Sequence, residues 1–196
     1  MKKGILALII IVGLLLIGGL WIGGMNNTMV EKDEAATGQW ANVESSYQRR
    51  ADLIPNIVNT AKGYAEFEQE TLTQVIEARA KATSVNIDAS NITPENIAAF
   101  QQAQGGLTSA LSRLLATFER YPDLKANENF KELINELERT ENRINVERNR
   151  FNGLAQDYNT YIRKFPRNIF AGMLGFDRKG YFKAEAGAEE APTVEF

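Results

Sequence analysis

The residues best placed for chemistry are charged side chains that interrupt otherwise apolar helix patterns. Arg50 falls at an apolar position of one seven-residue pattern, and Glu141, Glu147 and Arg148 fall at such positions of another. If the two helices pack side by side in opposite directions, both interruptions lie at the same level. We therefore expect a buried or half-buried ionic layer, with Arg50 paired to Glu141 or Glu147 and Arg148 nearby. Such a layer either sets helix register, which we favour, or forms a binding or proton-handling site.

Composition excludes several kinds of catalysis. The chain has no cysteine and no histidine, so thiol nucleophiles, Ser-His-Asp triads, the usual zinc sites and Glu-x-x-His di-iron centres are absent. A glycosidase needs only two carboxylates, and Glu136, Glu138 and Glu141 supply several. These carboxylates lie on a helix with a coiled-coil pattern, where a solvated face or an ionic layer is expected. We therefore predict no enzymatic activity, no cofactor and no metal site.

A second polar group lies near the C-terminus, where basic residues alternate with aromatic ones over residues 163–183. The basic residues are Arg163, Lys164, Arg167, Arg178, Lys179 and Lys183. This composition suits contact with a membrane surface. The alternative is that the aromatic side chains fold back and close an open end of the domain. Residues 184–196 carry only acidic charges and are expected to be a disordered tail; with a net charge of −3, nucleic-acid binding is not expected.

The elements that must position these residues begin with an apolar run at residues 4–24. At ~1.5 Å per residue, this run can cross the ~30 Å hydrocarbon core of a bilayer. A signal peptide would be shorter and end in an Ala-x-Ala-like site, and a core helix would not be apolar on all sides. We predict an uncleaved membrane anchor, with residues 1–25 forming a cytoplasmic tip and the span. Lys2 and Lys3 place the N-terminus in the cytoplasm and the rest outside, in a periplasm or at the cell surface.

Residues 26–165 predict four amphipathic helices joined by short connections. The expected helices cover residues 28–64, 66–81, 94–121 and 127–165. Thr93 is the expected N-cap of the third, and Pro55 should kink the first or remove a hydrogen bond. The predicted fold is therefore all-α, a transmembrane helix followed by an up-and-down four-helix bundle.

The end of such a bundle farthest from the membrane is a candidate partner surface. The turns there would bring together Lys62, Tyr64, Tyr121, Asp123 and Lys125. The alternative is turn chemistry alone, with Pro122 and Asn127 ending one helix and capping the next.

Several sequence blocks resemble the LemA family. Residues 49–58 read RRADLIPNIV, residues 121–130 read YPDLKANENF, and residues 140–144 read TENRI; the similarity extends over residues 5–183. The resemblance implies one N-terminal membrane helix, a four-helix bundle and no established enzymatic activity. Some relatives are encoded near membrane metallopeptidases, which implies a role in envelope maintenance. Family members often have histidine where this chain has Ala51 and Phe67, so no role of those histidines carries over.

These observations lead to an expected function and its alternatives. We expect a membrane-anchored, non-enzymatic scaffold or interaction protein of the bacterial envelope that binds a protein partner or a second copy. The glycine-rich anchor favours close helix packing. The first alternative is a membrane-surface-binding or membrane-shaping protein that uses the anchor together with residues 163–183. The second is a ligand-binding bundle in which Arg50 contacts the ligand.

Overall fold

The computed structural model describes residues 2–63 and 68–183, which form six helices and no strand. The helices are α1 (Lys2–Lys62), α2 (Gln69–Ser84), α3 (Pro94–Phe118), α4 (Pro122–Ala126), α5 (Glu128–Arg163) and α6 (Arg167–Leu174). The predicted all-α class is confirmed. Tyr64, Phe67 and the predicted acidic tail lie outside the described residues.

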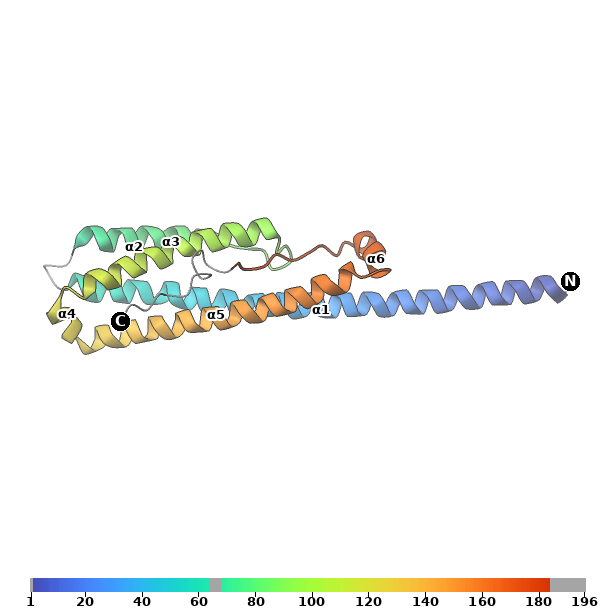
Figure 1. Ribbon diagram of the computed structural model, residues 1–196, viewed down its shortest axis with the longest axis horizontal. Coiled ribbons are helices and arrows are strands. Elements are labelled where there is room, and N and C mark those ends of the chain that lie inside the picture. Colours follow the sequence, from blue (N-terminus) through green and yellow to red (C-terminus); the bar gives the residue numbers. More distant parts are fainter. Residues whose placement is uncertain (1, 64–67, 184–196) are drawn as a thin grey trace, which may run out of the picture.

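Helix α1 continues without a break from the apolar run into the rest of the fold (Figure 1). It is the one described helix that is long and apolar enough to cross a membrane. Its large apolar side chains are exposed from Ile5 to Trp21, and burial begins at Met25 and Met29. The helix predicted as an anchor therefore projects from the fold instead of packing inside it.

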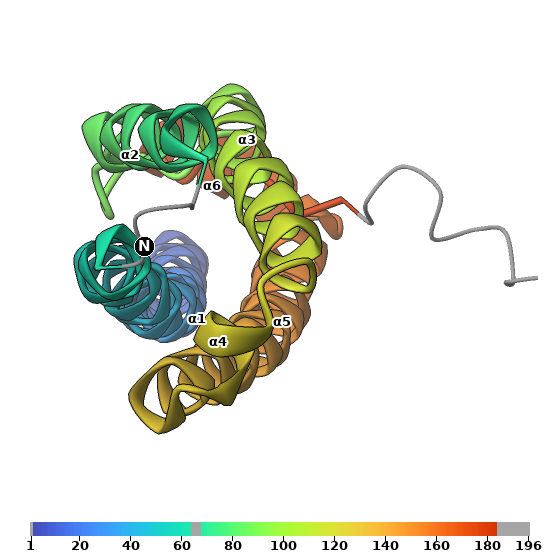
Figure 2. The ribbon, with the colours of Figure 1, turned by 90° about the vertical axis from the view of Figure 1, so that its left-hand side faces the viewer.

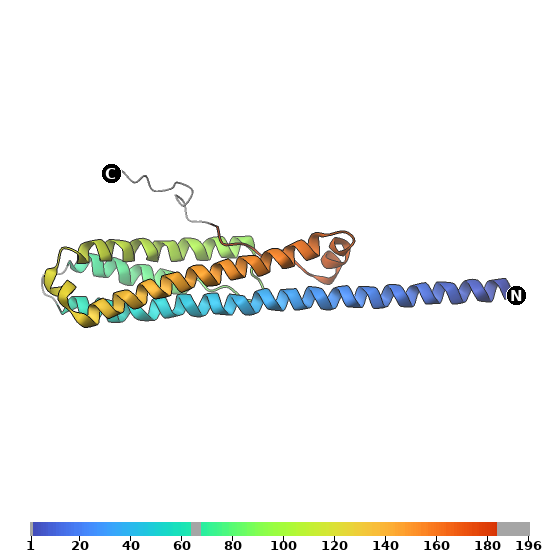
Figure 3. The ribbon, with the colours of Figure 1, turned by 60° about the horizontal axis from the view of Figure 1, so that its bottom comes forward.

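The other long helices lie alongside the second half of α1. The chain runs out along α1, back along α2, out along α3 and back along α5 (Figures 1 and 3). The closest packed pairs are α1 with α5 and α2 with α3. Viewed along the long axis, these four helices surround a common interior, and α4 lies across one end (Figure 2). We call this assembly the helical bundle.

The middle of the bundle is an aromatic core. Trp40 meets the rings of Phe100 and Phe151 edge-on, with 5.4 Å between ring centroids in both pairs, and it stacks on Phe182 at 5.8 Å. These residues come from α1, α3, α5 and the segment after α6. The C-terminal segment therefore contributes directly to the core, as expected if its aromatic residues fold back.

Local sequence explains the helix ends. The Thr93 hydroxyl accepts a hydrogen bond from the Asn96 backbone N–H at 3.2 Å, which confirms the predicted N-cap of α3. Asn127 caps α5 in the same way through the Phe130 N–H, at 2.9 Å. Gly175 ends α6 with φ of 79°, a left-handed conformation that favours glycine.

Pro55 lies inside α1, and the helix continues through it. Proline has no N–H, so the carbonyl of Ala51, four residues earlier, loses its helical donor. Arg79 on α2 replaces this donor, because its Nε donates to the Ala51 carbonyl oxygen at 2.7 Å. The predicted loss of a hydrogen bond at Pro55 is thus compensated by a bond that ties α2 to α1.

Candidate functional site

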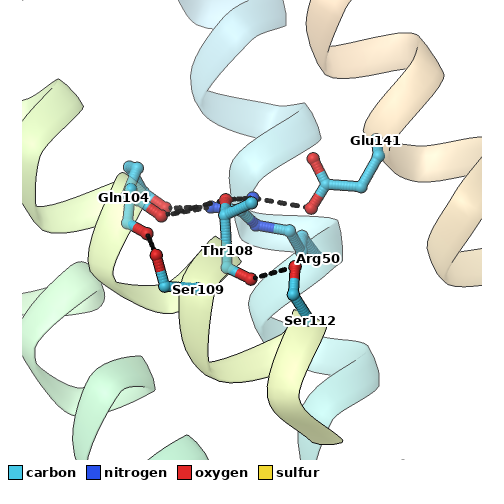
Figure 4. A network of polar contacts seen from close by, with 7 residues as sticks. Arg50, Gln104, Thr108, Ser109, Ser112 and Glu141 are labelled. Carbon is cyan, nitrogen blue, oxygen red and sulfur yellow. Dashed lines mark hydrogen bonds and ion pairs between the residues drawn. The ribbon is translucent and has the colours of Figure 1, made fainter. Parts of the chain in front are cut away.

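The most unusual polar group in the bundle is the guanidinium of Arg50, whose residue is only 1% exposed. Its Nη1 donates to the Glu141 carboxylate at 2.6 Å and to the Thr108 hydroxyl at 3.0 Å. Its Nη2 donates to the Gln104 side-chain oxygen at 2.6 Å. One side chain on α1 therefore connects α3 and α5 (Figure 4).

The surroundings of Arg50 compensate for most, but not all, of its burial. The Tyr47 ring lies 5.0 Å from the guanidinium carbon, a favourable cation–π geometry. The Glu141 side chain is 34% exposed, so its carboxylate stays partly hydrated and costs less to desolvate than a fully buried one. Within the described part of the chain, the Arg50 Nε is buried without a hydrogen-bond partner.

A half-open groove of about 760 Å³ lies between α3 and α5, with Arg50 at its floor. Its walls combine amides, hydroxyls and charged groups with apolar side chains such as Leu111, Leu137 and Ile144. The polar lining residues are Gln101, Gln104, Thr108, Ser109, Ser112, Glu138, Glu141, Asn142, Asn145 and Arg148. We call this feature the α3–α5 groove.

The structure divides the predicted ionic layer. Arg50 lies against Glu141, whereas the Glu147 carboxylate accepts from the Gln39 side-chain amide on α1 at 2.7 Å. Arg148 donates to the Lys183 carbonyl oxygen at 2.9 Å. At 3.6 residues per turn, positions six apart differ by about 120° around a helix, so Glu141 and Glu147 cannot both face Arg50. The expectation of one shared layer is therefore wrong for Glu147, whereas Arg148 lines the same groove as Arg50.

Two partners of Arg50 were missed by the sequence analysis. Gln104 and Thr108 on α3 supply an amide oxygen and a hydroxyl. A signal for Gln104 was present, since it is a polar residue at a seam position of its helix and is buried in the structure. Thr108 carries no such signal, because its role depends on how α3 is rotated toward α1.

The basic C-terminal residues do not share one surface. Lys179 is buried, and its Nζ lies 2.9 Å from the Asp33 carboxylate and 3.2 Å from the Thr37 hydroxyl. The Lys183 backbone is bonded to Gln101. The expectation of membrane contact is wrong for Lys179, because α1 provides its counter-charge inside the bundle. For Lys183, whose side chain is exposed, membrane contact stays a prediction.

The remaining basic residues surround α6, where apolar side chains are exposed. Phe165 is 81% exposed and Met173 is 78% exposed, and Ile169 and Leu174 are also exposed. The opposite face of α6 packs through Ala171 in one cluster with Met29 of α1, just beyond the apolar run. The basic residues on this segment are Arg163, Lys164, Arg167 and Arg178. An apolar face with basic neighbours thus lies next to the point where the apolar helix leaves the bundle.

The predicted partner surface at the far end is only partly formed by the described residues. Lys62 ends α1, and Asp123 lies exposed in the first turn of α4. Tyr121 is half-buried against the core. Tyr64 lies outside the described residues, and Lys125 is in α4.

Of the carboxylates considered for glycosidase chemistry, Glu136 is held by two arginines. Hydrogen bonds from Arg139 and Arg49 hold the pKa of Glu136 below its ordinary value. A catalytic general acid requires a raised pKa instead. Across residues 2–63 and 68–183, no group of three acidic side chains is placed to hold a metal ion.

The apolar helix is exposed and continues into an all-helical bundle. These two features place the chain among helical proteins with one N-terminal apolar helix. The model of the LemA family matches residues 39–196, and the chain belongs to this family. The magnetosome protein MamQ 2 of Paramagnetospirillum magneticum is 28% identical over 86% of this chain and 68% of the relative. The protein LemA of Metamycoplasma hominis is 24% identical over 84% of this chain and 71% of the relative.

Proposed function

We propose that this chain is a membrane-anchored, non-enzymatic interaction protein of the bacterial envelope. Its four long helices form an up-and-down four-helix bundle outside the cytoplasm, and the α3–α5 groove binds a protein partner or a second copy. The observation that carries this proposal is the groove, about 760 Å³ in volume and lined by both polar and apolar side chains, on a bundle built as a direct continuation of the apolar helix.

The wall of the groove favours a macromolecular partner. Gly105 lies on this wall, and a Cβ added there would meet nothing within 4 Å. Internal packing therefore does not require this glycine, although it costs about 1 kcal/mol relative to alanine inside a helix. A bare wall allows the backbone of a partner to approach closely.

Site-specific photocrosslinking tests this function. A benzophenone amino acid at Ser109, in the groove, is expected to give a discrete adduct of higher mass in intact membranes. The matched control is Ser45, an exposed serine in a separate shallow pocket between α1 and α5. Adducts of equal yield at both positions, or no adduct at either, would contradict the proposal.

The alternative function, contact with the membrane surface, is supported by the exposed apolar face of α6. In this reading Phe165, Ile169 and Met173 insert at the interface, and the surrounding basic residues contact anionic headgroups. The anchor and α6 then form two attachments.

Because the chain has no cysteine, a single probe can test this contact in the full-length protein. An environment-sensitive fluorophore on Met173→Cys, in vesicles containing anionic lipid, should shift to shorter wavelength and be quenched by nitroxide lipids. Ser45→Cys is the control and should show neither effect. Emission from Met173→Cys that matches the control would eliminate this alternative.

A further inference from the structure

The segment after α6 is bound by amide side chains of the bundle. Each amide forms two hydrogen bonds with the backbone of one residue, accepting from its N–H and donating to its carbonyl oxygen. Asn159 accepts from the Lys179 N–H at 2.9 Å and donates to its carbonyl oxygen at 2.8 Å. Asn152 accepts from the Phe182 N–H and donates to its carbonyl oxygen, both at 2.9 Å. These paired bonds to N–H and C=O recognise an extended chain independently of its side chains, and the Asn159 Nδ2 additionally donates to the Tyr181 hydroxyl at 2.8 Å.

A third amide repeats this geometry from the opposite wall. Gln101 on α3 accepts from the Lys183 N–H at 3.1 Å and donates to its carbonyl oxygen at 2.9 Å. The segment therefore advances between α5 and α3, toward the end of the bundle that carries α4. Gln101 also lines the α3–α5 groove, so the last described residue lies at the entrance of this groove.

The amide side chains on α5 that bind the segment are regularly spaced. Asn159 and Asn152 are seven residues apart, which is about 10.5 Å along a helix. The bound residues, Lys179 and Phe182, are three apart, which is about 10 Å in an extended chain. One further step of seven along α5 reaches Asn145, which lies in the groove and is exposed. One further step of three along the bound chain reaches residue 185.

We propose that residues 184–188 of this chain bind in the α3–α5 groove, with the Asn145 amide gripping the backbone of Glu185. The segment continues directly from Lys183 and reads AEAGA, which is small enough to pass the bare wall at Gly105. At ~3.3 Å per residue, five residues span about 16 Å, which carries the chain from the groove entrance past Gln104 and Thr108, the α3 partners of Arg50. The groove is thus a site for an extended peptide backbone, and its resident occupant is the chain itself.

The same groove is proposed to bind a partner, so the biological consequence of this docking rests on the proposed function. Residues 184–188 then compete with the partner, and the partner must displace them. Docking of the segment itself is measured without any partner, so the two proposals fail separately.

Disulfide trapping in the purified full-length chain tests the docking. Ser109 and residue 186 lie at one level in the proposed register, so Ser109→Cys with Ala186→Cys should form an intramolecular disulfide under mild oxidation. The matched pair, Ser45→Cys with Ala186→Cys, should give at least tenfold less. Equal yields would overturn the proposal. Disulfide-linked dimers as the main product would also overturn it, because they would place the segment in a second copy.

Two further measurements separate docking from a folding effect. Asn145→Ala should lower the disulfide yield at least fivefold, whereas the exposed neighbour Asn149→Ala should leave it unchanged. In single-cysteine proteins, the Ser109→Cys thiol should be alkylated about tenfold faster when the chain ends at Lys183. The Ser45→Cys thiol should show no change. Equal effects of the two asparagine variants, or no acceleration at Ser109→Cys, would overturn the proposal even if one double variant fails to fold.

Discussion

At the scale of single residues, Arg50 shows how a buried charge is held in an apolar interior. Its two terminal nitrogens have close oxygen partners on α3 and α5, and one of these, Glu141, remains partly hydrated. The sequence predicted the pairing from a seam interruption. It could not predict that Glu147 faces Gln39 instead, because this depends on the rotation of α5 about its axis.

Removing the arginine should cost more than neutralising its partner. Arg50→Met leaves Gln104 and Glu141 without their donor, and we expect the free energy of unfolding to fall by about 3 kcal/mol. Glu141→Gln keeps an acceptor at the surface and should cost about 1 kcal/mol. Urea unfolding followed by circular dichroism measures both. Equal losses would show that the carboxylate carries the stabilisation.

Tyr158 should make stability depend on pH in the alkaline range. Burial, with a further contribution from Asp33, raises the pKa of the Tyr158 hydroxyl above its ordinary value of 10.0. The unfolded chain therefore ionises first, so this stability is complete below pH 10 and is lost as pH rises further. Between pH 10 and 11 the loss is up to about 1.4 kcal/mol.

Tyr158→Phe removes this alkaline loss. The variant also lacks the hydrogen bond from the hydroxyl to the Asp177 carbonyl oxygen, so it should be about 1 kcal/mol less stable at pH 8. Unfolding at pH 8 and pH 11 compares the two slopes. A variant with the same alkaline loss as the original chain would refute the assignment to Tyr158.

At the scale of elements, the periodic apolar pattern predicted the long helices and the Thr93 cap, because these depend on neighbouring residues. The apolar run and the first bundle helix, predicted as adjoining ranges, are one continuous helix in the structure. The hydrogen bonding at Pro55 could be predicted only in part. The lost hydrogen bond follows from proline chemistry, whereas its replacement by Arg79 requires the packing of α2.

The Pro55 junction predicts a specific coupling. Arg79→Met leaves the buried Ala51 carbonyl without the donor that Arg79 supplies and should cost about 1–3 kcal/mol. In a Pro55→Ala background the helix supplies its own donor, so the same substitution should cost at least 1 kcal/mol less. A double-mutant cycle of unfolding free energies measures the difference. Strictly additive effects would show that Arg79 acts elsewhere.

At the scale of the whole molecule, the C-terminal segment closes the bundle. Phe182 fills the space among Trp40, Phe100 and Phe151, which belong to three different helices. Sequence reasoning left open whether the aromatic residues of this segment contact lipid or core. The structure divides them. Phe165, which precedes α6, is exposed, whereas Phe182, in the segment that returns along the bundle after α6, is buried.

This division predicts unequal effects of the same substitution. Phe182→Ala should lower the free energy of unfolding by about 3–5 kcal/mol, because it leaves a cavity beside Trp40. Phe165→Ala, at an exposed site, should change it by less than about 0.5 kcal/mol. Chemical unfolding followed by tryptophan fluorescence tests the pair. Similar losses would contradict the placement of Phe182 in the core.

The uninterrupted α1 couples orientation inside a bilayer to orientation outside it. Along one rigid helix, each residue added turns everything beyond it by about 100°. If two anchors associate through one glycine-bearing side, the angle at which their bundles meet is set by the number of residues between Gly24 and Trp40. The anchor then sets the rotation of each bundle about the helix axis. A single-residue insertion near Thr28 would turn a different side of each bundle toward its neighbour.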